Sequence, residues 1–405
     1  MFDHEPQQPG WSLETLITPV SAQGFFDRYH ERDFLYSPGH AGRSLETLFQ
    51  VSALEDLMCQ MQDLDDVKTT GGRAGSPAPA RRGAAGGYFA DYADGKTIVV
   101  NGIHRRWAPV RDLCAALAAD MVTTLQCNLY VTPAGAQGLD CHWDGHDVLV
   151  LQVGGSKAWT LYPMIDNMPA PDAPGQGITP DAPPLAELTL RAGDVLYVPR
   201  GMPHVAQATD ETSAHLTIGL IGVTWRDLMQ AAVHVAAQTR TDMRRVLPVG
   251  WVSGDIAAPE AYAAAAQVLA DRDVLHRAVD LLAAKVIEAA PVPVRDPFAS
   301  LDLVDAMTLE TELSRPARSL VRCIANETGA TLHFPGGQID GTDKTLWAFG
   351  FFAETARFRI RDIPGWYSDA ERMKLARDLV CAGLYAITPG SPLAMDACAT
   401  PGERT

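Results

Sequence analysis

Two short motifs place metal-binding side chain types next to predicted strands. His142 and Asp144 flank Trp143 in HWDGHDVLVLQVGG, directly before an apolar run. In an extended chain, residues i and i+2 point to the same face, so the imidazole and the carboxylate are presented together while the indole points away. A second motif, GDVLYVPRGMPH, ends at His204 and is expected to return a histidine to the same sheet. Two histidines and one carboxylate are the ligands of non-haem Fe(II) centres, which leave positions open for substrate and dioxygen.

A lone lysine, Lys157, opens the next apolar segment after the turn 154–156. A lysine is rarely buried without a partner, because an unpaired charge removed from water is costly. Its ammonium can pair with the far carboxylate of a dicarboxylate whose other end chelates the iron, and such charge-assisted contacts are strong. That dicarboxylate would be 2-oxoglutarate. Asn128 and Tyr130, at i and i+2 on the preceding predicted strand, and Thr217 on a later one are expected to add polar contacts.

Many short predicted strands, separated by Gly and Pro turns, must position these residues. Their pattern favours a sandwich or barrel over a parallel α/β sheet. Helical segments are expected within 12–60 and over 110–123, and the Gly-, Ala- and Pro-rich stretch 71–87 is expected to be a solvated loop. The predicted strands span 98–100, 125–131, 148–153, 158–162, 187–191, 194–198 and 215–221.

The second half of the chain has a different character. From Trp225 it becomes alanine-rich and helical, with a stripe of apolar residues at 275, 279, 282 and 286 that suits either an internal core or a dimer seam. A Pro-rich hinge at 290–298 precedes helices, strands at 330–334 and 356–360, and a final helix over 369–386. Helices followed by a short hairpin resemble a winged helix. Residues 291–405 carry 12 basic and 15 acidic side chains, however, which does not support DNA binding.

Length and composition set the class of protein. A chain of 405 residues is expected to form two or three domains, and it contains no apolar run near the ~18 residues that span a bilayer. No basic and apolar leader opens the sequence, so we expect a cytoplasmic location. Seven cysteines without a C-x-x-C pair predict reduced thiols, mostly packed in cores. The net charge of −16 disfavours nucleic acid and suits basic protein partners, although acidity also serves solubility.

With these motifs in hand, the sequence resembles the JmjC ribosomal-oxygenase family, iron- and 2-oxoglutarate-dependent hydroxylases of the cupin superfamily. The resemblance rests on N-x-Y at 128–130, H-x-D at 142–144, G-x-K-x-W-x-L-Y at 155–162 and G-D-x-L-Y-x-P-x-G-x-x-H at 193–204. It implies an α+β chain with three parts. These are a double-stranded β-helix (cupin/JmjC jelly roll) with N-terminal helices over 1–225, a helical dimerisation region over 226–290 and a winged-helix-like domain over 291–405.

The resemblance also implies roles for individual residues. His142, Asp144 and His204 match the iron ligands, Lys157 matches the residue that binds the 2-oxoglutarate carboxylate, and Asn128 and Tyr130 match positions lining the same pocket. Thr217 is transferred with them as a cosubstrate contact. The implied reaction consumes O2 and hydroxylates an amino-acid side chain, histidine or arginine, of a protein or peptide.

The sequence departs from the family beside the iron motif. Trp143 stands where the family often has Tyr, and Gly145-His146-Asp147 follows, so the substrate is open. A ribosomal protein is favoured, a peptide precursor of a natural product is the alternative, and a non-catalytic cupin-like binding protein is the runner-up from another class. His146 and His215 are expected to be ordinary satisfied histidines, and Tyr130 and Trp159 mainly packing residues.

Overall fold

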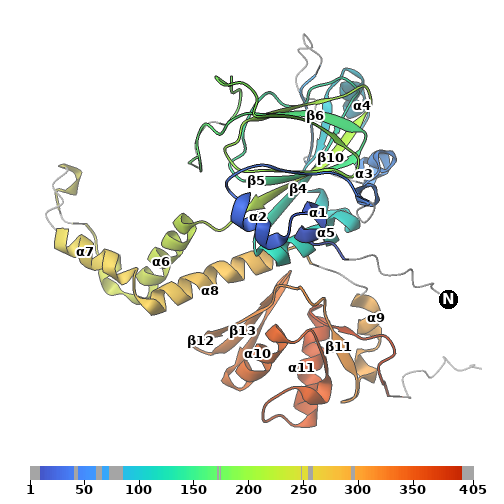
Figure 1. Cartoon of the computed structure of the whole chain (residues 1–405). Coiled ribbons are helices and arrows are strands. Elements are labelled where there is room, and N and C mark those ends of the chain that lie inside the picture. Colours follow the sequence, from blue (N-terminus) through green and yellow to red (C-terminus); the bar gives the residue numbers. More distant parts are fainter. Residues whose placement is uncertain are drawn as a thin grey trace, which may run out of the picture. The chain divides into compact units, whose positions relative to one another are not determined.

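The computed structural model describes residues 10–40, 44–60, 66–72, 85–170, 173, 175–247, 249–253, 259–292 and 297–394 (Figure 1). The chain divides into two compact units, Met1–Gly222 and Val223–Thr405. The residues of both predicted site motifs lie in the first unit.

The first unit is built on two antiparallel sheets. The larger sheet has the strand order β1-β8-β5-β10-β4-β3-β2, and the smaller has the order β7-β6-β9. The strands of the larger sheet are β1 (Leu35–Ser37), β2 (Val67–Thr70), β3 (Thr97–Val100), β4 (Thr124–Thr132), β5 (Asp147–Gly154), β8 (Val195–Val198) and β10 (Ser213–Ile221). Those of the smaller are β6 (Ser156–Leu161), β7 (Ala186–Arg191) and β9 (His204–Ala208).

An apolar cluster joins the two sheets. Val148 and Val150 of β5 meet Trp159 and Leu161 of β6 in this buried core. On β4, alternate residues are buried on one face. On the other face Gln126 is exposed, and Asn128 and Tyr130 are half-buried. Helix α5 packs against this strand. The helices of this unit are α1 (Leu13–Ile17), α2 (Ala22–Arg28), α3 (Leu54–Gln60), α4 (Ala85–Ala93) and α5 (Ala108–Met121).

The second unit contains a helical part and two small sheets, ordered β12-β13-β14 and β15-β11-β16. Helices α6 and α8 pack together through small and branched side chains such as Ala232 and Val274. Its helices are α6 (Trp225–Thr239), α7 (Pro259–Val268), α8 (Arg272–Ala289), α9 (Pro297–Asp302), α10 (Leu346–Glu354) and α11 (Asp369–Cys381). Its strands are β11 (Glu312–Ser314), β12 (Arg322–Asn326), β13 (Gly329–Phe334), β14 (Gly337–Thr342), β15 (Arg357–Arg359) and β16 (Ala386–Ile387).

Most predicted strands are confirmed, with several corrections. No expectation covered β9 and the edge strands β1 and β2, or β11, β12, β14 and β16 of the second unit. The expected hairpin of 330–334 with 356–360 is wrong, because β13 pairs with β12 and β14 whereas β15 pairs with β11 in another sheet. The predicted loop 71–87 lies mostly outside the described residues, but its last three residues begin α4. The H-x-D motif is not in a strand; it lies in the extended segment before β5. The final helix stops at Cys381 rather than 386, because Gly383 adopts a left-handed φ of 73° and the chain turns into β16.

Two further expectations concern the whole chain. The six described cysteines are all free, as predicted, but only Cys114 and Cys127 are buried, so the expectation that most would be packed in cores is wrong. The apolar stripe on α8 is divided, since Val286 is buried while Leu275 and Val279 are each 39% exposed. Among the helices that the structure describes, none has both the length and the apolar character needed to cross a membrane.

The turn between β5 and β6 provides a test of this architecture. Gly155 has φ of 59°, and a Cβ there would lie 1.9 Å from the Thr212 carbonyl oxygen. We expect Gly155→Ala to lower the free energy of unfolding by about 3 kcal/mol, through backbone strain and this clash together. Gly177→Ala is the matched control, because Gly177 has φ of 65° with open space around it; it should lose only about 1 kcal/mol. Equal losses in urea denaturation would show that the clash is relieved.

Candidate active site

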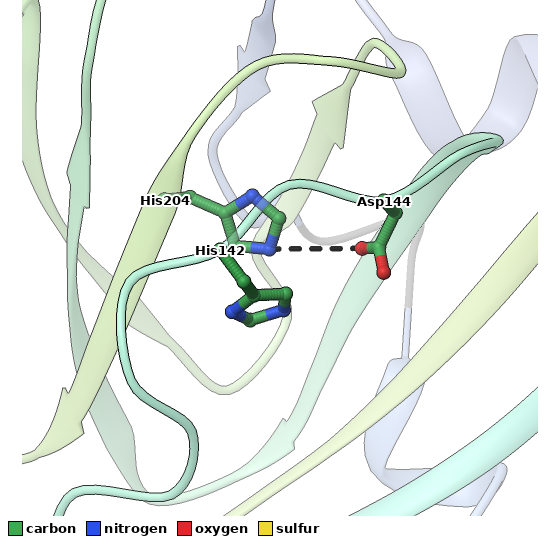
Figure 2. A group of neighbouring side chains, drawn as sticks. All are labelled: His142, Asp144 and His204. Atoms are coloured by element: carbon green, nitrogen blue, oxygen red, sulfur yellow. Dashed lines mark ion pairs between the residues drawn. The ribbon is translucent and has the colours of Figure 1, made fainter. Parts of the chain in front are cut away.

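A reciprocal backbone pairing brings the two histidines of the predicted iron site together. The His142 amide donates to the His204 carbonyl at 3.1 Å, and the His204 amide donates to the His142 carbonyl at 2.8 Å. Directly opposed residues of an antiparallel pair present their side chains on one face. The two imidazole rings consequently lie with centroids 4.4 Å apart (Figure 2).

Each imidazole is oriented by the same local contact. The Nδ1 of His142 lies 2.8 Å from the Asp140 carbonyl, and the Nδ1 of His204 lies 3.0 Å from the Met202 carbonyl. A carbonyl only accepts, so both Nδ1 atoms carry a proton, and in the neutral imidazole each Nε2 atom keeps a lone pair for a metal ion. Burial lowers the pKa of His204, which favours the neutral, ligating form.

Asp144 completes the cluster from the segment that follows His142. Its Oδ2 lies 3.7 Å from the His204 Nε2, and the ligand atoms of the three side chains all lie within 4.8 Å of one another (Figure 2). The Asp144 carbonyl accepts a hydrogen bond from the Gly201 amide, which fixes the backbone beside the carboxylate. Within the described part of the chain, no other group of three such residues lies this close.

Trp143 and Asp147, which lie beside the ligands in sequence, do not contribute to the cluster. The Trp143 indole packs against Gly175, where an added Cβ would come within 3.1 Å of the ring. Asp147 accepts hydrogen bonds from the Tyr197 hydroxyl at 2.7 Å and the Arg200 amide at 2.9 Å, so it anchors the start of β5. The departures at Trp143 and Asp147 therefore support the scaffold and leave the lining of the site to their neighbours.

The cluster lies in a cavity of about 390 Å³ that also holds every other predicted site residue. Exposure along one face of β4 falls from Gln126, which is exposed, through Asn128 and Tyr130, which are half-buried, to the fully buried Thr132. The cavity therefore has an open mouth near Gln126 and a closed end near Thr132. The predicted residues that line it are Asn128, Tyr130, His142, Asp144, Lys157, His204 and Thr217.

Lys157 lies at the closed end without a counter-charge. Its side chain is 3% exposed, and its Nζ donates to the Thr132 hydroxyl at 3.1 Å. Among the described residues no carboxylate forms an ion pair with it. Burial lowers the pKa of the ammonium from its usual 10.5 to about 7. A buried cation whose only partner is a neutral hydroxyl leaves room for an anionic ligand.

Two of the polar lining residues are held in donor form. The Gly102 amide donates to Asn128 Oδ1 at 3.0 Å, so the NH2 group of that side chain points away from Gly102 and is left as a donor. Burial and, second, the charge of Asp144 raise the pKa of Tyr130 to about 12, so its hydroxyl keeps its proton. These groups suit the recognition of an acceptor-rich ligand.

Two histidines that were expected to be ordinary satisfied side chains, His146 and His215, both line the cavity. The expectation is wrong for His215, whereas the Nδ1 of His146 lies 3.2 Å from the Asp147 carbonyl, as in a satisfied histidine. His215 is 3% exposed, and its Nδ1 is buried without a hydrogen-bond partner, so it is not a satisfied core histidine. His146 occupies space opened by Gly219, where a Cβ would lie 2.8 Å from the imidazole. His215 is two residues before Thr217 and His146 is two residues after Asp144, so the spacing indicates that both share a face with site residues, but it does not indicate whether their nitrogens have partners.

The residues present fit the predicted metal and cosubstrate. Two neutral Nε2 donors and one carboxylate, set on one side, match the facial ligand set of non-haem Fe(II). The unpaired ammonium of Lys157 stands at the far end of the same cavity, where the second carboxylate of a chelating dicarboxylate would need a cation.

Comparison with known proteins shows what this chain resembles. Residues 105–228 match the JmjC domain family model, and the two-sheet architecture of the first unit is consistent with this match. The resemblance inferred from the motifs is confirmed at this level.

Two curated relatives carry related names. The chain is 29% identical over 250 residues to the bifunctional lysine-specific demethylase and histidyl-hydroxylase NO66 of Dictyostelium discoideum, covering 58% of this chain and 49% of that protein. It is 27% identical over 250 residues to human ribosomal oxygenase 1, covering 58% and 39%. The chain thus spans about half or less of the length of these relatives.

Solved structures extend the likeness in fold beyond the JmjC domain. The Escherichia coli protein ycfD aligns with a TM-score of 0.60 at 14% identity, covering 90% of this chain and 98% of that one. A second structure of this ribosomal oxygenase, in complex with cobalt and 2-oxoglutarate, aligns with a TM-score of 0.57 at 14% identity, covering 90% and 97%. At such identity the likeness concerns the fold.

The pH dependence of folding stability should report the buried Lys157. Because its pKa falls from 10.5 to about 7 on folding, the unfolded chain binds more protons between these values and stability rises with pH. From pH 7 to pH 9, the free energy of unfolding of the native chain should rise by about 2 kcal/mol more than that of Lys157→Met. Urea denaturation at the two pH values measures this, and parallel changes in both proteins would contradict it.

Proposed function

We propose that this chain is an Fe(II)- and 2-oxoglutarate-dependent dioxygenase that hydroxylates an amino-acid side chain of a protein or peptide. One observation carries the proposal: two neutral Nε2 atoms and a carboxylate converge in a cavity whose closed end holds a buried, unpaired lysine. A metal alone would not need Lys157, and an anion site alone would not need the three ligands.

The roles of the residues follow from these positions. His142, Asp144 and His204 hold iron, and Lys157 binds the distal carboxylate of 2-oxoglutarate. When bound, iron and 2-oxoglutarate activate O2, giving succinate, carbon dioxide and a hydroxylated product. The carboxylate favours the charged form of Lys157, so the site takes up a proton wherever the free protein holds the neutral amine.

The remaining lining orients the cosubstrate and keeps water out. Asn128, Tyr130 and Thr217 place polar groups along one wall of the cavity. Val148, Val150 and Trp159 form the apolar wall, which excludes water from the reacting groups. The more exposed Gln126 and His146 lie near the mouth, where the side chain to be hydroxylated would enter.

The net charge of the chain and its similarity to known oxygenases favour a basic polypeptide as the substrate. Residues 1–222 contain 14 basic and 26 acidic side chains, so −12 of the total charge of −16 belongs to the unit with the cavity. Such a field attracts basic chains, as in ribosomal proteins. The name histidyl-hydroxylase of one relative favours histidine as the hydroxylated residue, and arginine is the other candidate from the family resemblance. A peptide precursor of a natural product is the alternative substrate, and a non-catalytic cupin-like binding role is the alternative function.

The wider organisation is proposed with the function. The domains are 1–225, 226–290 and 291–405, with a winged-helix-like last domain. The protein is cytoplasmic, binds no nucleic acid directly and forms a homodimer through 226–290. The last point has structural support, because Trp225, Met229 and Val233 form a stripe at helical spacing on α6, exposed by 79%, 51% and 44%.

Metal content should separate the ligands from the cosubstrate site. His142→Ala and Asp144→Ala should each lose bound iron and succinate formation, because one of only three protein ligands is gone. Lys157→Ala should keep its iron while 2-oxoglutarate binding weakens by about 2–5 kcal/mol, the loss expected from removing one partner of a buried charge pair. Elemental analysis and calorimetry measure the two quantities. Asp210→Ala, at an exposed carboxylate, is the control. Normal metal content and activity in either ligand variant would refute the site.

Light scattering should show a dimer at micromolar concentration. Met229→Glu with Val233→Glu should give a monomer, because two charges would be buried at the interface. Gln230→Glu with His234→Glu is the matched control, since it places two acidic side chains on exposed neighbouring positions of α6. A monomeric native chain, or a dimer that survives the first pair of substitutions, would contradict this interface.

The substrate class is tested by incubating the enzyme, iron and 2-oxoglutarate with host ribosomal proteins and with peptides encoded near the gene. We expect one oxygen, a gain of about 16 Da, on a basic polypeptide. Peptide fragmentation then identifies the modified residue. Oxygen incorporated only into small metabolites would refute a polypeptide substrate, and no succinate under any condition would favour the non-catalytic alternative.

A further inference from the structure

His215 is a buried aromatic side chain with fixed orientation at the wall of the cavity. It lies on β10 opposite Tyr130 of β4. The two rings stack with centroids 4.9 Å apart and planes 6° apart, and the Trp159 ring meets the His215 ring at a centroid distance of 5.7 Å and an angle of 82°. These contacts fix the plane of the imidazole, so the directions of its two nitrogens are set by packing.

Among the described residues, neither ring nitrogen of His215 has a hydrogen-bond partner, and Nδ1 is shielded from solvent. Packing alone does not require them, since a phenylalanine ring would stack equally well. A buried polar group without a partner is unfavourable and calls for an explanation, such as a ligand.

The position of His215 identifies the part of the ligand that it can reach. It lines the same cavity as Lys157. On β10, His215 is two residues from Ser213, which pairs with Thr132 of β4. The Thr132 hydroxyl accepts the hydrogen bond from Lys157 Nζ. Burial and, second, the charge of Lys157 hold the pKa of His215 well below its ordinary value. A neutral imidazole beside the ammonium still offers one N–H donor.

We propose that His215 is a positioning residue that donates a hydrogen bond to the distal carboxylate of 2-oxoglutarate alongside Lys157. This inference rests on the proposed function. A carboxylate presents about four lone-pair sites, and Lys157, which already donates to Thr132, satisfies only part of them. His215 supplies a second hydrogen-bond donor at the closed end. Lys157 then binds the carboxylate by charge and His215 fixes its orientation, which directs the opposite end of the cosubstrate toward the metal ligands.

The test compares two ligands that differ only in the distal group. 2-Oxopentanoate has the same five-carbon 2-oxo acid chain as 2-oxoglutarate but lacks the distal carboxylate. Calorimetry on the Mn(II)-loaded full chain without oxygen should show that His215→Phe weakens 2-oxoglutarate binding about tenfold or more, as for a lost hydrogen bond to a charged group. The affinity for 2-oxopentanoate should stay unchanged. His215→Asn, which keeps an N–H donor, should recover part of the loss.

Each outcome has a distinct meaning. If the native chain binds Mn(II) but no 2-oxoglutarate, the proposed function fails and this inference fails with it. If the native chain binds 2-oxoglutarate and His215→Phe binds it equally well, only the inference is overturned. Equal weakening of the binding of both ligands would also overturn it, and would indicate a structural role for His215. That role would be shared with Gln152, which pairs with His215 on β5 and whose Oε1 also lacks a hydrogen-bond partner among the described residues. If the Phe variant does not fold, the Asn variant should show a smaller but selective loss, weaker binding of 2-oxoglutarate with unchanged binding of 2-oxopentanoate, and equal changes for the two ligands would overturn the inference.

Discussion

The candidate site depends on the pair of backbone hydrogen bonds between His142 and His204. This pairing ties the extended segment before β5 to the first residue of β9, in the other sheet. It sets the two imidazoles on one face, and the carbonyls of Asp140 and Met202 then turn both Nε2 atoms toward Asp144. Backbone geometry thus preorganises the three ligands, although His142 and His204 are 62 residues apart in sequence. Side-chain packing has only to hold the rotamers.

The cavity behind this pairing keeps charges and donors unsatisfied within the chain. Lys157 is buried with a hydroxyl as its hydrogen-bond partner, and His215 is buried with no partner among the residues that the structure describes. Both arrangements lower the stability of the empty fold, and a ligand that supplies a carboxylate recovers that loss on binding. The apolar wall from Val148 to Trp159 raises the value of each such contact, because it keeps water from competing. The free energy that these unpartnered groups cost the empty protein therefore adds to the affinity for a carboxylate ligand.

Much of this arrangement could be predicted from the sequence, and the misses have physical causes. The alternation along β4 and the i, i+2 spacing of Asn128 and Tyr130 predicted both the strand and its inner face. His142, Asp144, Lys157 and His204 were found because charged or ligating residues beside apolar runs require partners. Strand β9 was missed because HVAQA has no clear alternation, and its pairing comes from β6 rather than from its own pattern. His215 was misread because its lack of a partner depends on the register of β10 against β4 and β5, which no local pattern reveals. The space that Gly219 leaves for His146 is likewise a contact between distant segments.

The central claim is that one metal ion and one dicarboxylate occupy this cavity together. The most direct measurement is a crystal structure of the protein with Mn(II) and 2-oxoglutarate in the absence of oxygen, with anomalous scattering to locate the metal. We expect one anomalous peak between His142 Nε2, Asp144 and His204 Nε2, with the 2-oxo acid end of the ligand on the metal and its distal carboxylate on Lys157. A metal bound elsewhere, or a ligand whose distal carboxylate points away from Lys157, would contradict it.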